Sequence, residues 1–132
     1  PKVTGSRGIQ VWIALQPRYT FDDTREWVGS LSQRVGAVVP DLVSWEWSKA
    51  DRGGRARLDY TQNALNKTLV APYAVRPVAR GAVSAPITWE ELDDPALHAQ
   101  RWDLRTILER TAERGDLFAG VLADPQELPP LD

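Results

Sequence analysis

Apolar and polar residues alternate along the first extended stretch of the chain. From Ile9 to Leu15 every odd position is apolar, and the other face carries Gln10, Trp12, Ala14 and Gln16. A period of two residues predicts a β-strand. Further strands are predicted at 42–47 and 55–60, joined by a turn with two glycines, and at 67–75, where Pro72 indicates an edge position or a bend.

Between residues 20 and 40 the apolar residues recur at helical spacing. Thr20 or Asp22 can cap the start of this helix, and Pro40 closes it. The residues that share the helical spacing are Phe21, Trp27, Val28, Leu31 and Val35. One long helix is therefore predicted to follow the first strand.

An acidic helical region is predicted from about residue 88. Thr88 and Glu91 have the spacing of a capping box, which predicts a short helix, and a further helix over 103–114 ends at Gly115. The proline-rich residues 124–132 are expected to wrap the surface or to be loose. This order of elements predicts an α+β fold, in which helices flank a mixed and mainly antiparallel sheet.

Composition sets broad limits on the class of protein. A chain of 132 residues, 42% of them hydrophobic, is long enough for one compact domain or for part of a larger one. Residues 1–88 carry 12 basic and 7 acidic side chains, whereas 89–132 carry 4 and 11, so a polyanion would meet the first two-thirds of the chain. The absence of cysteine excludes disulfides and cysteine-based zinc sites. No apolar run or signal pattern indicates a membrane, so a soluble intracellular protein is expected.

Two glycines and two hydroxyl residues surround an arginine just before the first predicted strand. Glycine permits unusual backbone conformations and lets another group approach the main chain closely. Hydroxyls, free backbone N–H groups and a positive charge in such a turn would suit an anion such as a phosphate. The residues of this glycine turn are Thr4, Gly5, Ser6, Arg7 and Gly8. Taken without the rest of the chain, they favour an ordinary tight turn instead.

Polar residues also gather around one carboxylate, Asp59. In a strand over 55–61, Arg55, Arg57, Asp59 and Thr61 share one face, and Ala56, Leu58 and Tyr60 share the other. A carboxylate amid this much positive charge suits a hard cation whose phosphate ligands are held by the basic neighbours. A solvated sheet face with cross-strand ion pairs is the alternative that the pattern favours, because one carboxylate is too few for two-metal chemistry.

Other candidate residues are assigned structural roles from the pattern. Asp22 and Asp23 lie where a helix begins, so capping is the expected role of both. The only histidine, His98, is expected at the surface. Three tryptophans suit either base stacking or a small core, and the core is favoured for Trp45, Trp47 and Trp89.

Three stretches together resemble a known family. Residues 2–13, KVTGSRGIQVWI, are followed by 48–77, SKADRGGRARLDYTQNALNKTLVAPYAVRP, and by 86–95, PITWEELDDP. This succession resembles the polymerase domain of bacterial ligase D, a member of the archaeo-eukaryotic primase superfamily, and is most similar to its stand-alone actinobacterial homologues. The resemblance extends over nearly the whole chain, and residues 58–77 are its most distinctive block.

The resemblance implies an enzyme that extends nucleic acid ends with nucleotides, prefers ribonucleotides, uses Mn²⁺ or Mg²⁺ and serves non-homologous end joining. It makes Asp59 the catalytic, metal-binding aspartate of the third primase motif. It also makes the glycine turn the second motif, in which Gln10 replaces the usual histidine. An amide can still donate to a phosphate oxygen. The nucleotide-binding residues that the resemblance implies are Thr4, Gly5, Ser6, Arg7, Gly8, Gln10, Lys49, Arg52, Gln62, Asn63, Lys67 and Arg76.

The family's first motif, a pair of aspartates one residue apart, precedes the glycine turn, and Pro1 lies just before that turn. We therefore expect residues 1–132 to be the C-terminal half of a primase-polymerase domain and to be inactive alone. The implied partners are DNA ends and nucleoside triphosphates, with a ligase and end-binding repair proteins, at a cytoplasmic, nucleoid-associated location without a membrane. A non-catalytic nucleotide- or DNA-binding module is the alternative.

Overall fold

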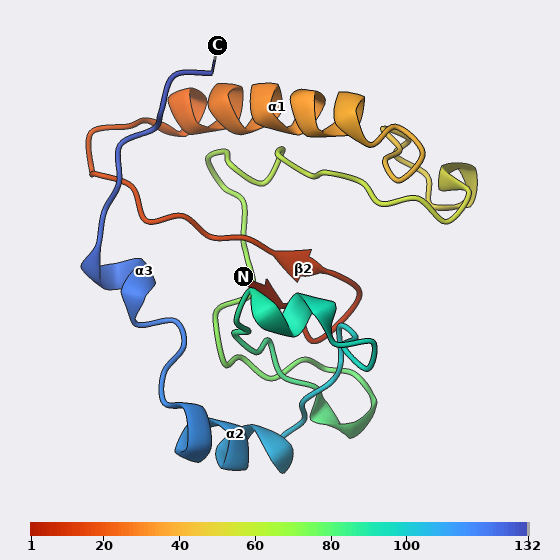
Figure 1. Cartoon of the computed structure of the whole chain (residues 1–132), viewed down its shortest axis with the longest axis vertical. Coiled ribbons are helices and arrows are strands. Elements are labelled where there is room, and N and C mark those ends of the chain that lie inside the picture. The colour runs from red at the N-terminus through yellow and green to blue at the C-terminus, as the bar shows by residue number, and fades with distance from the viewer. Residues whose placement is uncertain (132) are drawn as a thin grey trace. The chain divides into compact units, whose positions relative to one another are not determined.

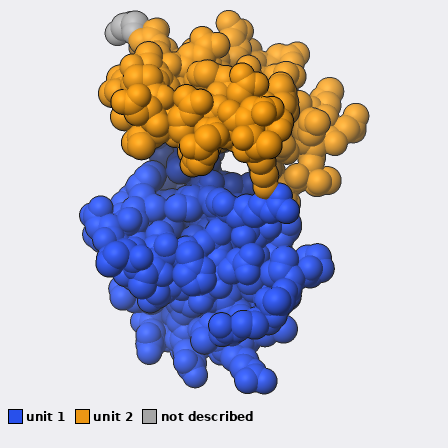
Figure 2. All heavy atoms as spheres, turned by 90° about the vertical axis from the view of Figure 1, so that its right-hand side faces the viewer, with its two compact units in different colours: residues 1–15, 70–126 blue, residues 16–69, 127–132 orange. Residues whose placement is uncertain are grey.

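The computed structural model describes residues 1–131, and these form two compact units (Figure 2). Unit 1 contains residues 1–15 and 70–126, whereas unit 2 contains residues 16–69 and the chain end from residue 127. The long segment of unit 2, residues 16–69, is thus inserted in sequence between the two segments of unit 1. Within residues 1–131 no helix is long and apolar enough to cross a membrane.

The core of unit 1 surrounds an extended segment over residues 82–87. Strands β1 (Lys2–Val3) and β2 (Ile9–Gln10) pair in antiparallel register, and the N–H of Val3 donates to the Ala85 carbonyl over 2.9 Å. Helix α2 (Thr106–Arg114) packs on these strands through Ile107. The buried residues of this core are Val3, Val83, Ala85, Ile87, Trp102 and Ile107. Every residue of 82–87 is buried, and the small side chains of Ala82, Ser84 and Ala85 let neighbouring segments pack closely against it.

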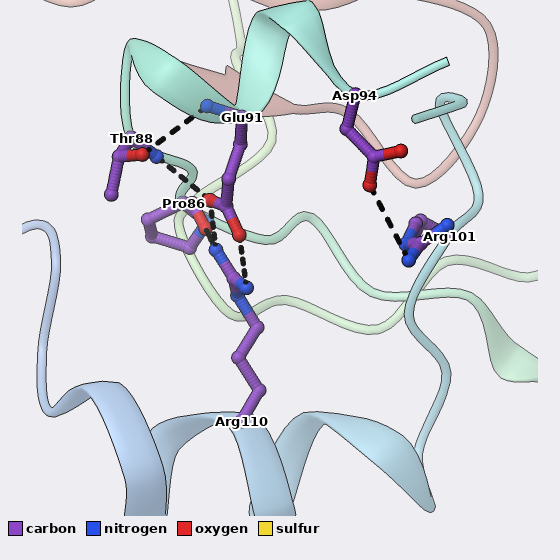
Figure 3. Close-up of polar contacts among 6 residues, drawn as sticks. All are labelled: Pro86, Thr88, Glu91, Asp94, Arg101 and Arg110. Carbon is purple, nitrogen blue, oxygen red and sulfur yellow. Dashed lines mark hydrogen bonds and ion pairs between the residues drawn. The ribbon is translucent and has the colours of Figure 1, made fainter. Parts of the chain in front are cut away.

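A buried ion pair joins α2 to the 3-10 helix η3 (Glu90–Asp93). Arg110 donates to both carboxylate oxygens of Glu91, over 2.7 and 2.6 Å, and to the Pro86 carbonyl over 2.9 Å (Figure 3). The Arg110 guanidinium also lies 4.0 Å from the centre of the Trp102 ring. Glu91 completes the expected capping box, because its carboxylate accepts from the N–H of Thr88 and the Thr88 hydroxyl accepts from the N–H of Glu91.

Unit 2 is built on the long helix α1 (Phe21–Val38), drawn in orange in Figure 1. Thr20 caps it in a reciprocal capping box with Asp23, so the predicted start of the helix and the capping role of Asp23 are confirmed. The residues on the buried face of α1 are small, which lets aromatic rings approach the helix backbone closely. A Cβ on Gly36 would lie only 2.8 Å from Trp45 Cζ2.

The proline-rich tail contacts unit 2 as the sequence predicts for a segment that wraps the surface. The indole N–H of Trp27 donates to the Pro129 carbonyl over 2.7 Å, and the N–H of Leu128 donates to the Tyr19 hydroxyl over 2.9 Å. Further turns of helix occur at η1 (Ala50–Arg52), η2 (Ala79–Gly81) and α3 (Gly120–Ala123).

The mixed α and β fold class is confirmed, with a short antiparallel sheet and helices, but the strands are shorter than predicted. The run from Ile9 to Leu15 pairs only at Ile9–Gln10 and through an isolated bridge at Leu15, and Val11 and Ile13 are exposed. Isolated β-bridges, and not strands, occur in the segments 42–47, 55–60 and 67–75, where strands were predicted. Extended backbone without a neighbouring strand makes no ladder, so alternation alone overestimates pairing.

Candidate functional site

The glycine turn of unit 1 is closed by its own threonine. The hydroxyl oxygen of Thr4 accepts from the N–H groups of Ser6, Arg7 and Gly8 over 3.2–3.3 Å, and the N–H of Thr4 donates to the Gly8 carbonyl over 2.9 Å. The expectation that these N–H groups are free is therefore wrong. The groups that the turn offers outward are the exposed guanidinium of Arg7 and the half-buried side chain of Ser6.

Gly5 is required at its position because the chain itself comes close. Its φ is +66°, and a Cβ there would lie 2.7 Å from Arg76 Cγ and 2.8 Å from the Val83 carbonyl carbon. The stem of Arg76 thus packs directly on the turn. Its Nε is buried and has no hydrogen-bond partner among residues 1–131. Unit 1 therefore brings together the glycine turn and Arg76, two of the predicted nucleotide-binding elements.

A buried lysine lies beside this arrangement, and the sequence did not signal it. Lys2 is fully buried, and its ammonium donates to the Val70 carbonyl over 2.9 Å and to the Ser84 hydroxyl over 2.6 Å. Burial, with a contribution from the charge of Arg76, lowers the pKa of Lys2 to about 8. Lysine is seldom buried, so its position in a short strand gave no reason to expect this.

A cavity of about 420 Å³ opens next to the glycine turn. Its polar lining is Ser6, Arg7, Arg80, His98, Gln100 and Asp103. Arg80 pairs with Asp103 over 2.6 Å, and backbone N–H groups of Thr106 and Arg105, together with Arg80, lower the pKa of Asp103 to about 2. His98 is exposed at the edge of this cavity, which agrees with its predicted surface position.

Asp59 lies in unit 2 and is exposed. Its Oδ1 accepts from the N–H and the hydroxyl of Thr61, and its Oδ2 accepts from Gln62 Nε2 over 3.3 Å. Burial opposes ionisation, but the hydrogen bonds from Thr61 and Gln62 and the charge of Arg57 together hold the pKa of Asp59 below its usual value. Asp59 is therefore ionised at physiological pH. It is positioned by a turn and not by the predicted strand.

The basic residues near Asp59 in sequence differ in their contacts. Arg52 donates to the Glu46 carbonyl over 2.9 Å and to the Trp47 carbonyl over 2.8 Å, so its guanidinium binds its own backbone. The guanidinium carbon of Arg57 lies 3.4 Å from the centre of the Trp47 ring. The predicted residues Lys49 and Lys67 are exposed, whereas Gln62 and Asn63 are half-buried.

The described residues do not make a complete metal site. No group of three or more histidine, cysteine, aspartate or glutamate side chains within residues 1–131 is arranged to hold an ion. Asp59 supplies one carboxylate, and both of its oxygens already accept hydrogen bonds. The glycine turn belongs to unit 1 and Asp59 to unit 2. Gln10, a predicted nucleotide-binding residue, accepts from the Trp12 indole over 3.3 Å.

Known proteins match most of this chain. The sequence model of the LigD primase-polymerase domain matches residues 1–118. The multifunctional non-homologous end joining protein LigD of Mycobacterium bovis is 35% identical over 124 residues, which cover 94% of this chain and 16% of that protein. The bifunctional non-homologous end joining protein LigD of Bacillus subtilis is 31% identical over 130 residues, or 98% of this chain and 21% of that protein.

A solved structure agrees with these relatives. The polymerase domain from Mycobacterium tuberculosis ligase D, in complex with DNA, superposes with a TM-score of 0.72 at 35% identity, covering 80% of this chain and 36% of that one. The chain spans about a sixth to a fifth of the length of the two curated relatives. The resemblance seen in the glycine turn and in residues 58–77 is thus confirmed, and the chain belongs to the LigD primase-polymerase domain family.

Proposed function

We propose that this chain acts in nucleotidyl transfer at DNA ends during non-homologous end joining, as part of a primase-polymerase domain. The observation that carries the proposal is the match of residues 1–118 to the family. The DNA-bound polymerase domain that superposes on this chain supports DNA as the partner. In this proposal unit 1 contributes to binding the nucleoside triphosphate.

The contact between Gly5 and Arg76 supports the triphosphate-binding role. A cationic side chain packs on a turn that also presents Arg7, and Arg76 keeps a buried Nε without a partner in the described chain. Guanidinium groups form strong, directional hydrogen bonds with phosphate oxygens. Arg7 and Arg76 are therefore the two side chains of unit 1 that we assign to the triphosphate.

Asp59 contributes one carboxylate to a Mn²⁺ or Mg²⁺ site in the same proposal. Such an ion would offset the negative charge of the nucleotide's phosphates, but it needs more oxygen ligands than Asp59 offers. The remaining carboxylates would come from outside the described residues, so we expect the chain alone to bind triphosphate without extending a primer.

Primer extension tests this assignment. The chain alone is compared with a chimera in which residues 1–118 replace the matching part of the Mycobacterium tuberculosis polymerase domain, and with the same chimera carrying Asp59→Asn. With Mn²⁺ and ribonucleotides, only the unsubstituted chimera is expected to extend the primer, because the amide keeps the size of the carboxylate but loses its charge. Extension by the chain alone, or equal extension by both chimeras, would contradict the role given to Asp59.

Direct binding separates the triphosphate site from catalysis. Arg76→Ala and Arg7→Ala should each weaken triphosphate binding to the chain, measured by calorimetry without a primer. Arg114→Ala is the matched control, because Arg114 is an exposed arginine of unit 1 at the end of α2. A control variant that loses as much affinity as Arg76→Ala would mean that net charge alone determines binding.

A non-catalytic nucleotide- or DNA-binding module is the second candidate. It is favoured by the lack of a carboxylate cluster among residues 1–131. The chimera distinguishes the two functions, since a binding module would retain triphosphate affinity but would give no extension even beside the relative's own carboxylates.

A further inference from the structure

Trp47 is held in an exposed position by a dense set of contacts in unit 2. Trp47 is 72% exposed, whereas Trp102 is only 9% exposed. Arg52 donates to the carbonyls of Glu46 and Trp47, which restrains the two peptide groups that flank the Trp47 Cα. The ring is therefore exposed on a backbone that its own loop restrains.

Arg57 supports one face of this ring. The guanidinium carbon lies 3.4 Å from the ring centre, so Arg57 stacks on the indole, and its Nε and Nη1 are buried without hydrogen-bond partners among the described residues. One face of Trp47 is thus covered by a cation. Since the residue is still largely exposed, the opposite face is open to a ligand.

The charge around the ring is positive. Between residues 45 and 57 the chain carries Lys49, Arg52, Arg55 and Arg57 against Glu46 and Asp51. Lys49 and Arg55 are exposed, and the Arg55 Nε bonds to the Arg52 carbonyl over 3.0 Å. An open aromatic face beside exposed cations matches the chemistry of an unpaired nucleotide, whose base stacks and whose phosphate is anionic.

We propose that Trp47, with Arg57 behind it, is a stacking site for one unpaired base of single-stranded nucleic acid, and that Lys49 and Arg55 hold the flanking phosphates. The ring is already positioned, so little side-chain freedom is lost when a base binds. Arg57 also restrains the ring from its covered face. The biological setting, a single-stranded overhang at a DNA end, rests on the proposed function, but the binding itself does not.

Trp89 provides a matched control within the same chain. It is also exposed, at 59%, but it precedes Glu90 and Glu91, so its surroundings are acidic. If exposure alone made a tryptophan bind nucleic acid, both residues would contribute. The proposal requires that only Trp47 does.

The test measures fluorescence anisotropy of a labelled short oligothymidylate with the 132-residue chain, without triphosphate or divalent metal. Trp47→Ala is expected to weaken binding by about 5- to 150-fold, the range for loss of one base–aromatic stack. Trp47→Phe should retain most of the affinity, and Trp89→Ala should change nothing. An abasic oligomer of equal length keeps the phosphates but lacks bases, so its weaker binding should be insensitive to Trp47→Ala.

A second measurement uses the unsubstituted protein. Photocrosslinking to an oligonucleotide that contains 5-iodouracil should give a crosslinked peptide that contains Trp47, identified by mass spectrometry. No binding, equal affinities for Trp47→Ala and the unsubstituted chain, an equal loss on the abasic oligomer, or crosslinks only at Trp89 would each overturn the proposal. An apolar protein segment as the natural occupant would give these negative results. Primer extension by the chimera is scored separately, so failure of either proposal is distinguishable from failure of the other.

Discussion

Removing Arg110 should destabilise unit 1 strongly. Arg110 is 9% exposed, and its loss removes a two-bond ion pair with Glu91, a hydrogen bond to Pro86 and the stack on Trp102. Breaking a buried pair by deleting one partner costs roughly 3–5 kcal/mol, because the other charge is left uncompensated. The Glu91 side chain is 20% exposed, so water can solvate part of it, and we expect a loss of about 3 kcal/mol for Arg110→Ala.

Arg101→Ala is the matched control for this prediction. Arg101 pairs with Asp94 over 3.5 Å in the same unit, but both side chains are more than a third exposed (Figure 3). Exposed pairs contribute about 0–1 kcal/mol. Urea denaturation gives the free energies of unfolding, and amide exchange at Ile107 assigns the loss to unit 1. Equal losses for the two variants would refute the reasoning that burial makes the Arg110 pair important.

Three further predictions follow from single positions. Gly5→Ala should cost more than about 1 kcal/mol in thermal or urea unfolding, because of its positive φ and the approach of Arg76, whereas Gly8→Ala should be nearly neutral, since nothing lies within 4 Å of its added Cβ. Lys2 has a pKa of about 8 when folded against 10.5 when unfolded, so the unfolded chain binds more protons between these values and stability should rise with pH across that window. Lys2→Met should remove that slope. Glu91 has a pKa below its usual value, chiefly through its hydrogen bonds with Arg110. Its contribution is therefore present above pH 4.5 and lost as pH falls through the folded pKa, and Glu91→Gln should remove this part of the acid sensitivity.

Local signals in the sequence predicted the helix ends well. Thr20 with Asp23, and Thr88 with Glu91, form the reciprocal bonds that a capping box requires, and Gly115 ends α2 with a φ of 70°. These features depend on residues a few positions apart. Their chemistry is therefore complete within a short window of sequence.

Contacts between distant segments were predicted less well. Residues 82–87 form the most buried segment of unit 1, yet Ser84 and Pro86 interrupt any apolar period there. Trp45, Trp47 and Trp89 were expected in a core, and the structure exposes all three. Burial depends on which distant segments pack together, and a local pattern carries no information about that.

The same difference between local signals and distant contacts applies to the candidate site. The importance of Gly5 was visible in the sequence, but its close neighbour, Arg76, was identified as a binding residue only by the family resemblance. The contact between them joins residues that lie far apart in the chain. Lys2 was missed entirely, since no pattern distinguishes a buried lysine from an exposed one.

The insertion of residues 16–69 between the two segments of unit 1 has a consequence for synthesis. Lys2 and Ser84, whose side chains are hydrogen bonded, lie 82 residues apart. At roughly 5–20 residues per second, a ribosome needs about 4–16 s to make the intervening chain. During that time β1 has none of its partners from 82–87, and the continuous segment of unit 2 from 16 to 69 is completed before those partners are made. The first residues of unit 1 to leave the ribosome are thus among its last to be buried, and they are the part of unit 1 that a chaperone would have most time to bind.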